Sequence, residues 1–259
     1  TLTYYSKTIA AMLNGVGKSP QQITTDDLRK YLMDYQTRRR SSKVTIDNIR
    51  RILSSFFSWL EDEDFIVKSP VRRIHKVKTA KIIKETYTDE ALELMRDNCS
   101  TVRDLAIIDL LASSGMRVGE LVTLNREDIN FNERECVVFG KGNKERKVFF
   151  NDRSILRLSE YIDYRKDNCE YLFCSLKKPF RRLNVGGVET NVKNIGKKAG
   201  VANCHPHRFR RTMACNALKK GMPIEQIQAL LGHENIETTK VYLCIDTDKL
   251  AVEHNRYLG

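Results

Sequence analysis

The chain has 259 residues, 41% of them hydrophobic, and a formal net charge of +12. This apolar content is too high for a disordered chain, and the length suits two domains of ordinary size. No apolar run approaches the ~20 residues that cross a bilayer, and no signal-peptide pattern opens the sequence. We therefore expect a cytoplasmic protein without a membrane span, and the positive charge favours a polyanionic partner, most simply nucleic acid.

The N-terminal part is predicted to be helical. Residues 1–12 continue a helical pattern, and Thr24 or Thr25 is expected to cap a second helix with Asp26 in its first turn. Apolar residues then recur at three- and four-residue steps from Ile46 to Leu60. Residues 1–75 are therefore predicted to form a helical-bundle domain.

Basic residues concentrate in this part of the chain. Residues 1–86 hold 17 Lys and Arg against nine Asp and Glu. A segment rich in charge and hydroxyl groups, residues 38–43, is predicted to be a loop that contacts DNA phosphates rather than only a solvated turn. The predicted DNA-binding residues are Arg38, Arg39, Arg40, Lys43, Arg50 and Arg51.

A basic linker over residues 76–86 is expected to join this domain to a second domain, residues 87–259. Thr88 is predicted to start a helix, and residues 102–113 form an apolar helix that ends at Ser114-Gly115. Residues 135–140 and 146–150 are rich in Val and Phe around a Gly-Asn turn, which predicts a β-hairpin. Helical patterns dominate afterwards, so the fold class is mainly α with a small antiparallel sheet.

Several residues in this second domain have the chemistry to hold and attack a phosphodiester. Arg117 follows Gly115-Met116, and His207 and Arg210 lie one turn apart on a predicted helix. His233 follows the predicted helix end at Gly232, and Thr238 or Thr239 is expected to cap a short helix carrying Tyr242. Lys141 sits at the hairpin turn.

Each of these residues also has an ordinary structural explanation. Arg117 has Glu120 as a possible ion-pair partner, turn lysines such as Lys141 are usually only solvated, and Tyr242 is one of ten tyrosines. Taken together, however, two arginine forks converging on one place would repel each other unless an anion lay between them, and a phosphate matches their geometry.

The sequence predicts no metal site and no disulfide. The seven cysteines are odd in number and scattered without a Cys-x-x-Cys pair. His205 and His207 suggest a metal pair, but no carboxylate or thiol cluster supports it. We expect no cofactor.

These segments resemble the tyrosine recombinase family and, within it, Xer-type recombinases and the integrases of bacterial mobile elements. The matching segments are Ser114-Gly115-Met116-Arg117-Val118-Gly119-Glu120-Leu121, Gly140-Lys141-Gly142-Asn143-Lys144-Glu145-Arg146, Pro206-His207-Arg208-Phe209-Arg210, Leu230-Leu231-Gly232-His233 and Thr238-Thr239-Lys240-Val241-Tyr242. The resemblance covers the whole chain, because the family also has a basic helical N-terminal core-binding domain.

The resemblance implies a role for each catalytic position. Tyr242 would attack the scissile phosphate and form a 3′-phosphotyrosyl link, while Arg117 and Arg210 stabilise the charged transition state. Lys141 would protonate the leaving 5′-oxygen, and His207 would assist proton transfer from the tyrosine. His233 would hydrogen-bond the phosphate. Glu120 matches an acidic position that supports these residues.

The resemblance also implies partners and a reaction pathway. The family acts as a homo-tetramer on two duplexes that carry specific recombination sites, and it exchanges strands through a Holliday junction without ATP or metal. A bacterial member would work in the cytoplasm at the nucleoid. The sequence leaves open the DNA target, the direction of recombination and the need for accessory DNA-bending proteins.

Two departures from the family pattern stand out. Arg211 occupies a position where many relatives carry a second histidine, and Leu243-Cys244 follows the tyrosine where Xer proteins often show a histidine. The second departure favours a mobile-element integrase. A type IB topoisomerase shares the nucleophile and arginines, and a DNA-binding regulator that has lost catalysis is a third interpretation, disfavoured because all six catalytic positions are filled.

Overall fold

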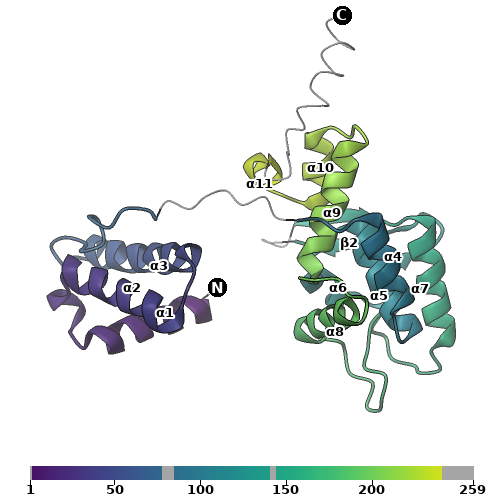
Figure 1. Cartoon of the computed structure of the whole chain (residues 1–259), viewed down its shortest axis with the longest axis horizontal. Helices are drawn as coiled ribbons and strands as arrows, with labels where there is room; N and C mark the ends of the chain where they lie inside the picture. Colours follow the sequence, from purple (N-terminus) through teal and green to yellow (C-terminus); the bar gives the residue numbers. More distant parts are fainter. Residues whose placement is uncertain (1, 78–84, 141–143, 241–259) are drawn as a thin grey trace, which may run out of the picture. The chain divides into compact units, whose positions relative to one another are not determined.

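A computed structural model describes residues 2–77, 85–140 and 144–240 of the chain (Figure 1). The chain divides into two compact units, residues 1–82 and 83–259. Each unit has its own apolar core, and no residue is shared between the two cores. Within the described residues, no helix is long and apolar enough to cross a membrane.

The first unit is helical, as the apolar periodicity predicts. Its elements are α1 (Leu2–Val16), the short 3₁₀ helix η1 (Pro20–Gln22), α2 (Thr25–Arg39) and α3 (Lys43–Asp62). Thr24 caps α2, since its hydroxyl accepts the Asp27 N–H while the Asp27 carboxylate accepts the Thr24 N–H. The core is built from one face of each helix, and Val71 beyond α3 is also buried in it.

The segment predicted to be a basic loop is mostly helical, which corrects that expectation. Arg38 and Arg39 form the last turn of α2, where cations complement the helix dipole. Arg40 ends the helix in a left-handed conformation with φ of 47°, and the Ser42 hydroxyl then caps α3, of which Lys43 is the first residue. Only residues 40–42 connect the two helices.

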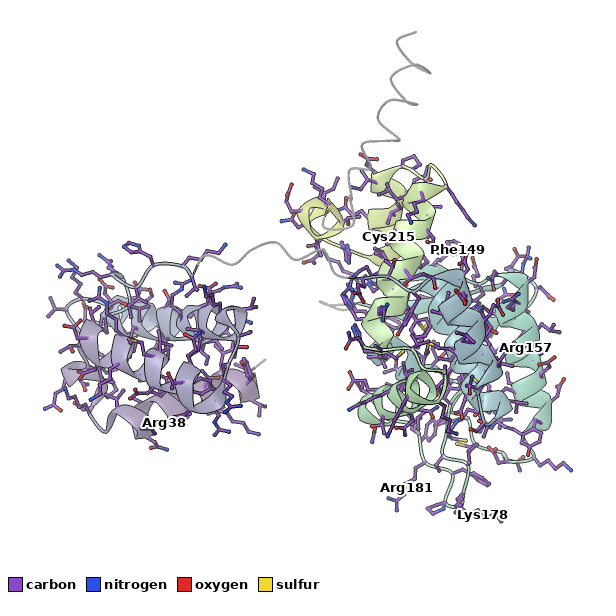
Figure 2. All side chains as sticks on the ribbon, in the orientation of Figure 1. Arg38, Phe149, Arg157, Lys178, Arg181 and Cys215 are labelled. Atoms are coloured by element: carbon purple, nitrogen blue, oxygen red, sulfur yellow. The ribbon has the colours of Figure 1, made fainter. Side chains whose placement is uncertain are left out.

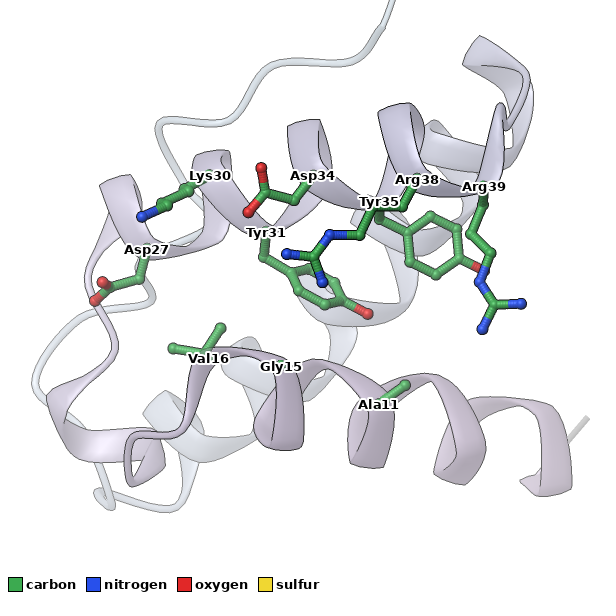
Figure 3. A pocket seen from close by; sticks show the side chains of 10 residues that line it. All are labelled: Ala11, Gly15, Val16, Asp27, Lys30, Tyr31, Asp34, Tyr35, Arg38 and Arg39. Atoms are coloured by element: carbon green, nitrogen blue, oxygen red, sulfur yellow. The ribbon is translucent and has the colours of Figure 1, made fainter.

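The packing of α1 on α2 leaves a groove of about 410 Å³ (Figure 3). Gly15 permits the close approach, because a Cβ atom there would lie 2.9 Å from Cε2 of Tyr31. Tyr31 and Tyr35 lie with their ring centroids 6.1 Å apart, and burial raises the pKa of Tyr31 above its usual value. The Arg38 side chain extends back toward Tyr31 in this view.

The second unit is mainly helical with one small sheet among its described residues. Its helices are α4 (Asp89–Asp97), α5 (Val102–Ser114), α6 (Val118–Thr123), η2 (Arg126–Asp128), α7 (Asp152–Tyr164), α8 (Val185–Lys198), α9 (Pro206–Lys219), α10 (Ile224–Leu231) and α11 (Ile236–Lys240). The apolar helix α5 is central, since it contacts both α7 and α9 (Figure 1). It ends where predicted, at Gly115, which adopts a left-handed conformation with φ of 59°.

The predicted hairpin is present as β2 (Glu135–Phe139) and β3 (Glu145–Phe149), paired antiparallel with Cys136 opposite Val148. A short strand that was not predicted, β1 (Ile129–Asn130), pairs with the other edge of β2. Two residues are too few to show a strand period, so the sequence carried no signal for β1. Residues 141–143 at the hairpin turn, including Lys141, lie outside the described residues.

A long irregular connection joins α7 to α8. Arg165 holds it by donating to the carbonyl oxygens of Tyr171 and Leu172, and Arg165 also pairs with Asp167. Lys178 and Arg181 project from the far end of this connection (Figure 2).

Candidate active site

Three of the residues that the sequence singled out, Arg117, Arg210 and His233, lie near one another, where the α5–α6 turn and the α10–α11 corner come together. Arg117 immediately precedes α6, and its Nη2 donates to the carbonyl oxygen of Gly232 at 3.1 Å. This bond joins positions 115 residues apart. The side chain of Arg117 remains 39% exposed, so its guanidinium is accessible to a ligand.

Glu120 is the partner that holds Arg117, as the sequence had suggested. Its carboxylate is buried and accepts the Arg117 Nη1 at 2.8 Å and the Arg117 backbone N–H at 2.7 Å. Because Glu120 binds both the backbone N–H and the guanidinium of Arg117, this guanidinium has little freedom to turn away from the pocket.

Arg146 is a site residue to which sequence reasoning gave no role. It lies on β3 and donates from Nη2 to the second oxygen of Glu120 at 2.8 Å. Burial lowers the pKa of Arg146 below its usual value, an effect that Glu120 opposes and the Arg117 charge reinforces. An arginine inside a run of strand-forming residues was the available signal, but the sequence does not say which carboxylate it meets.

Arg210 is 1% exposed and connects the ends of two helices. Its Nη1 donates to the carbonyl oxygen of Gly115 at 2.8 Å, and its Nη2 donates to the carbonyl oxygen of Leu231. Gly115 ends α5 just before Arg117, and Leu231 ends α10 just before His233. Arg210 therefore fixes the two turns from which Arg117 and His233 project.

The two predicted histidines occupy different environments. His207 is exposed in the first turn of α9, three residues before Arg210. His233 is half-buried, and its Nδ1 lies 2.9 Å from the Thr239 hydroxyl. Burial, followed by the charges of Arg210 and Arg117, lowers the pKa of His233 from 6.5 to about 4.

The predicted cap of the last helix is wrong. Helix α11 begins at Ile236, so Thr238 and Thr239 lie inside it rather than before it. The Asn235 side chain accepts the Glu237 N–H at the start of this helix. Thr239 is 1% exposed and faces His233, a contact that the sequence did not predict. Tyr242 lies outside the described residues.

Arg117, Arg146 and His233 line an open pocket of about 450 Å³. Lys144 and Glu234 lie at the pocket and pair with each other at 3.1 Å. The pocket lining within the described residues is Arg117, Gly140, Lys144, Glu145, Arg146, Gly232, His233, Glu234, Asn235 and Thr238. Arg117 and Arg146 share the single carboxylate of Glu120. Arg210 adds a further positive charge near His233, so a bound anion would be stabilised in this pocket.

Arg208 and Arg211, next to Arg210 on α9, hold the start of the second unit. Arg208 donates to the Thr86 carbonyl oxygen at 2.9 Å and lies 4.3 Å from the centroid of the Tyr87 ring. Arg211 donates to the Glu85 carbonyl oxygen at 2.8 Å. The departure from the family pattern at Arg211 therefore places a long donor against the chain that enters this unit.

The predicted DNA-binding residues divide into two groups. Arg50 donates to Asp47 at 2.8 Å, and Asp47 also accepts the Val77 N–H, so Arg50 belongs to a structural network of the first unit. The other residues have exposed side chains, and they lie at the end of α2 and the start and middle of α3: Arg38, Arg39, Arg40, Lys43 and Arg51.

One group of potential metal ligands lies among the described residues, consisting of Asp167, Cys169 and Cys174. Asp167 already pairs with Arg165 and Arg126 and accepts the Cys169 N–H. Its carboxylate charge is neutralised by two guanidiniums, which makes the group a poor cation site.

Two protein-family models match this chain. The phage integrase family model matches residues 73–248, and the model of the phage integrase N-terminal SAM-like domain matches residues 1–66. The chain is 32% identical to the tyrosine recombinase XerC of Leptospira interrogans over 244 residues, which cover 88% of this chain and 76% of that protein. It is 31% identical to the tyrosine recombinase XerA of Pyrococcus horikoshii, covering 90% of this chain and 79% of that protein.

Solved structures of similar fold include recombinases, some of them bound to DNA. The crystal structure of XerA recombinase superposes with a TM-score of 0.60 at 24% identity, covering 99% of this chain and 91% of that chain. XerH site-specific recombinase bound to a palindromic difH substrate gives a TM-score of 0.74 at 21% identity, covering 92% and 73%. A lambda integrase dimer bound to a COC′ core site gives 0.75 at 21% identity, covering 93% and 87%.

Proposed function

We propose a residue-level mechanism for this chain, which belongs to the phage integrase family and is a tyrosine-type site-specific DNA recombinase that cleaves and rejoins DNA. Tyr242 is the nucleophile. Its phenolic oxygen attacks the scissile phosphorus and displaces the 5′-oxygen, so the phosphate becomes linked to the tyrosine at its 3′ side. The bond energy stays in the phosphotyrosine, and a 5′-hydroxyl can reverse the step without ATP.

The pocket residues stabilise this reaction. Arg117 and Arg210 offset the charge that develops on the non-bridging oxygens. Lys141 gives a proton to the leaving 5′-oxygen, and His207 accepts the tyrosine proton. His233 donates a hydrogen bond to the phosphate. Its low pKa supports the neutral form of the imidazole at neutral pH, with Nε2 as the donor when Nδ1 accepts from Thr239.

One observation carries this proposal. Arg117 from the α5–α6 turn and Gly232-His233 from the α10–α11 corner are joined directly by the bond between Nη2 of Arg117 and the Gly232 carbonyl oxygen. Residues far apart in the chain thus line one cationic, open pocket of a size that suits a phosphodiester.

The first unit supplies DNA contacts and the second supplies the chemistry, with residues 1–75 as the core-binding domain, 76–86 as the linker and 87–259 as the catalytic domain. Exposed arginines at the end of α2 and on α3 would neutralise phosphates of the bound duplex. The working form is a homo-tetramer on two DNA sites that exchanges strands through a Holliday junction. Such a protein acts at the bacterial nucleoid, and the residues after Tyr242 favour a mobile-element integrase.

A nicked suicide duplex tests the nucleophile. The recombination site would first be selected from random-sequence duplexes by binding to the purified chain. Wild-type protein is expected to form a covalent adduct that survives denaturing electrophoresis, and Tyr242→Phe is expected to abolish it. Tyr164→Phe, at an exposed tyrosine of the same unit, serves as the control and should leave the adduct unchanged. An adduct that persists in Tyr242→Phe would overturn this assignment.

A further inference from the structure

The Arg146 guanidinium is buried at the candidate active site with some of its hydrogen-bond donors unsatisfied among the described residues. Its side chain is only 10% exposed, and within the described part of the chain this side chain makes one hydrogen bond, from Nη2 to Glu120. Its Nε and Nη1 atoms are buried and have no hydrogen-bond partner among the described residues. A buried guanidinium with unsatisfied donors destabilises the folded protein, so a position that keeps one calls for a compensating role.

The contacts of Arg146 point to that role. Arg146 and Arg117 hold the Glu120 carboxylate from two sides, since Oε1 accepts from Arg117 and Oε2 accepts from Arg146. Arg146 also lies directly under the α10–α11 corner, because a Cβ atom on Gly232 would be 2.7 Å from its Cδ and 2.8 Å from its Nε. The same glycine accepts the bond from Arg117 Nη2. Arg146 thus contacts both residues that bind the Arg117 guanidinium, Glu120 and Gly232.

We propose that Arg146 is a positioning residue for DNA cleavage, which fixes Glu120 and the Gly232 corner so that the Arg117 guanidinium faces the phosphate. The inference rests on the proposed function of this site. Arg146 does not itself touch the substrate, because its Nε and Nη1 atoms are inaccessible to solvent and its Nη2 is occupied by Glu120. Since Arg146 lies on β3, it also ties the strand that follows the Lys141 turn to Arg117.

An arginine is required by this geometry. A lysine reaches Glu120 with a single point charge and cannot at the same time fill the space under Gly232 with a planar group. Arg146→Lys is therefore expected to retain the ion pair and part of the activity, whereas Arg146→Met, of similar length and without charge, loses the support of Glu120.

The test compares cleavage of three suicide duplexes that differ only at the scissile phosphate. One carries the natural phosphodiester, one a methylphosphonate without the non-bridging negative charge, and one a 5′-bridging sulfur whose departure needs no proton donor. A residue that acts through Arg117 matters less when the phosphate charge is removed. A residue that acts through Lys141 matters less when the leaving group is sulfur.

On the natural duplex, Arg146→Met is expected to form the covalent adduct about 10–100-fold more slowly than wild type, a loss of the size found for residues that orient metal ligands. On the methylphosphonate, the rate of the same variant should lie within about threefold of the wild-type rate. On the bridging-sulfur duplex, the variant should regain little of its lost rate. The cleavage rate of Arg146→Lys on the natural duplex should lie between the rates of wild type and Arg146→Met. Arg153→Met, which removes an exposed arginine paired with Glu93 at 2.7 Å, is the matched control and should cleave all three like wild type.

Other outcomes would overturn the inference. An unchanged rate in Arg146→Met, or an equal loss on all three duplexes, would mean that Arg146 only stabilises the fold, which thermal unfolding of each variant would show. If only the bridging-sulfur duplex restored the rate of Arg146→Met, Arg146 would act through the proton donor Lys141. If wild-type protein itself forms no adduct with any duplex, the proposed function fails rather than this inference alone.

Discussion

Individual side chains at this site act through shared partners. Glu120 receives bonds from Arg117 and Arg146, and Gly232 receives a bond from Arg117 while it packs on Arg146. Since each contact fixes a residue that another contact also uses, single substitutions here should not be additive.

The protonation of His233 should make the stability of the fold depend on pH. Its pKa is lowered from 6.5 to about 4, so the unfolded chain binds a proton that the folded chain does not between these two values. Stability should therefore fall as pH decreases from about 6.5 to about 4, by roughly 1 kcal/mol because solvent screens a half-buried group. Urea unfolding of wild type and His233→Gln across this range measures the effect, and parallel curves would contradict it. Proton NMR of the imidazole should show a higher pKa once a phosphodiester occupies the pocket.

The Thr239 hydroxyl should orient the His233 imidazole for catalysis. Thr239→Val keeps the shape but removes the hydroxyl that lies 2.9 Å from His233 Nδ1, so the imidazole loses its orientation. We expect adduct formation to slow by about 3- to 10-fold, equivalent to the roughly 1 kcal/mol of one hydrogen bond. Thr239→Ser should restore the rate. Thr190→Val, at an exposed position of α8 that does not line the pocket, is the control, and an equal effect from both valines would count against the role of Thr239.

At the scale of elements, the end of α10 determines where His233 lies in the candidate active site. Gly232 stops this helix in a left-handed conformation with φ of 61°, which turns the chain so that His233 faces Arg117 and Thr239. Two constraints act on this one residue, because a side chain there would meet both an unfavourable backbone conformation and the Arg146 stem.

Gly232→Ala should therefore cost more than the backbone effect alone. The matched control is Gly200→Ala, whose φ of 69° is similar but whose surroundings are open. We expect about 1 kcal/mol of destabilisation for Gly200→Ala and about 2–4 kcal/mol for Gly232→Ala, because the second also forces Arg146 to move. Chemical denaturation measures both, and only Gly232→Ala should also reduce adduct formation. Equal losses in the two variants would mean that Arg146 yields without strain.

At the scale of the whole molecule, two separate cores predict two separate unfolding transitions. Trp59 is the single tryptophan of the chain and lies on α3, where it stacks near Phe56 and Phe65. Its fluorescence therefore reports on the first unit, while far-ultraviolet circular dichroism reports on both.

Phe57→Ala removes a fully buried ring from the first core and should destabilise that unit by about 3–5 kcal/mol. The fluorescence transition should move to lower urea, while the part of the circular dichroism transition that belongs to the second unit stays in place. Ile108→Ala, at a fully buried position of the second core, should do the reverse. Coincident shifts of both signals in either variant would show that the two units unfold together.

The sequence by itself determined the local elements and the chemical class of the site. Helix caps such as Thr24, helix ends such as Gly115 and Gly232, and the apolar period of α3 depend on neighbouring residues, so they can be predicted from nearby sequence. The ordered set of arginines, histidines and lysine pointed to phosphate chemistry for the same reason. Short elements such as β1 and the true start of α11 were missed, because a few residues carry too little periodic signal.

Only the tertiary structure decided which side chains support that chemistry. No local pattern says that Arg146 binds the same carboxylate as Arg117, or that Arg210 joins the ends of α5 and α10. Both arrangements bring together residues distant in the chain. The energy of a buried charge depends on the groups that packing brings to it, and packing is a property of the whole fold.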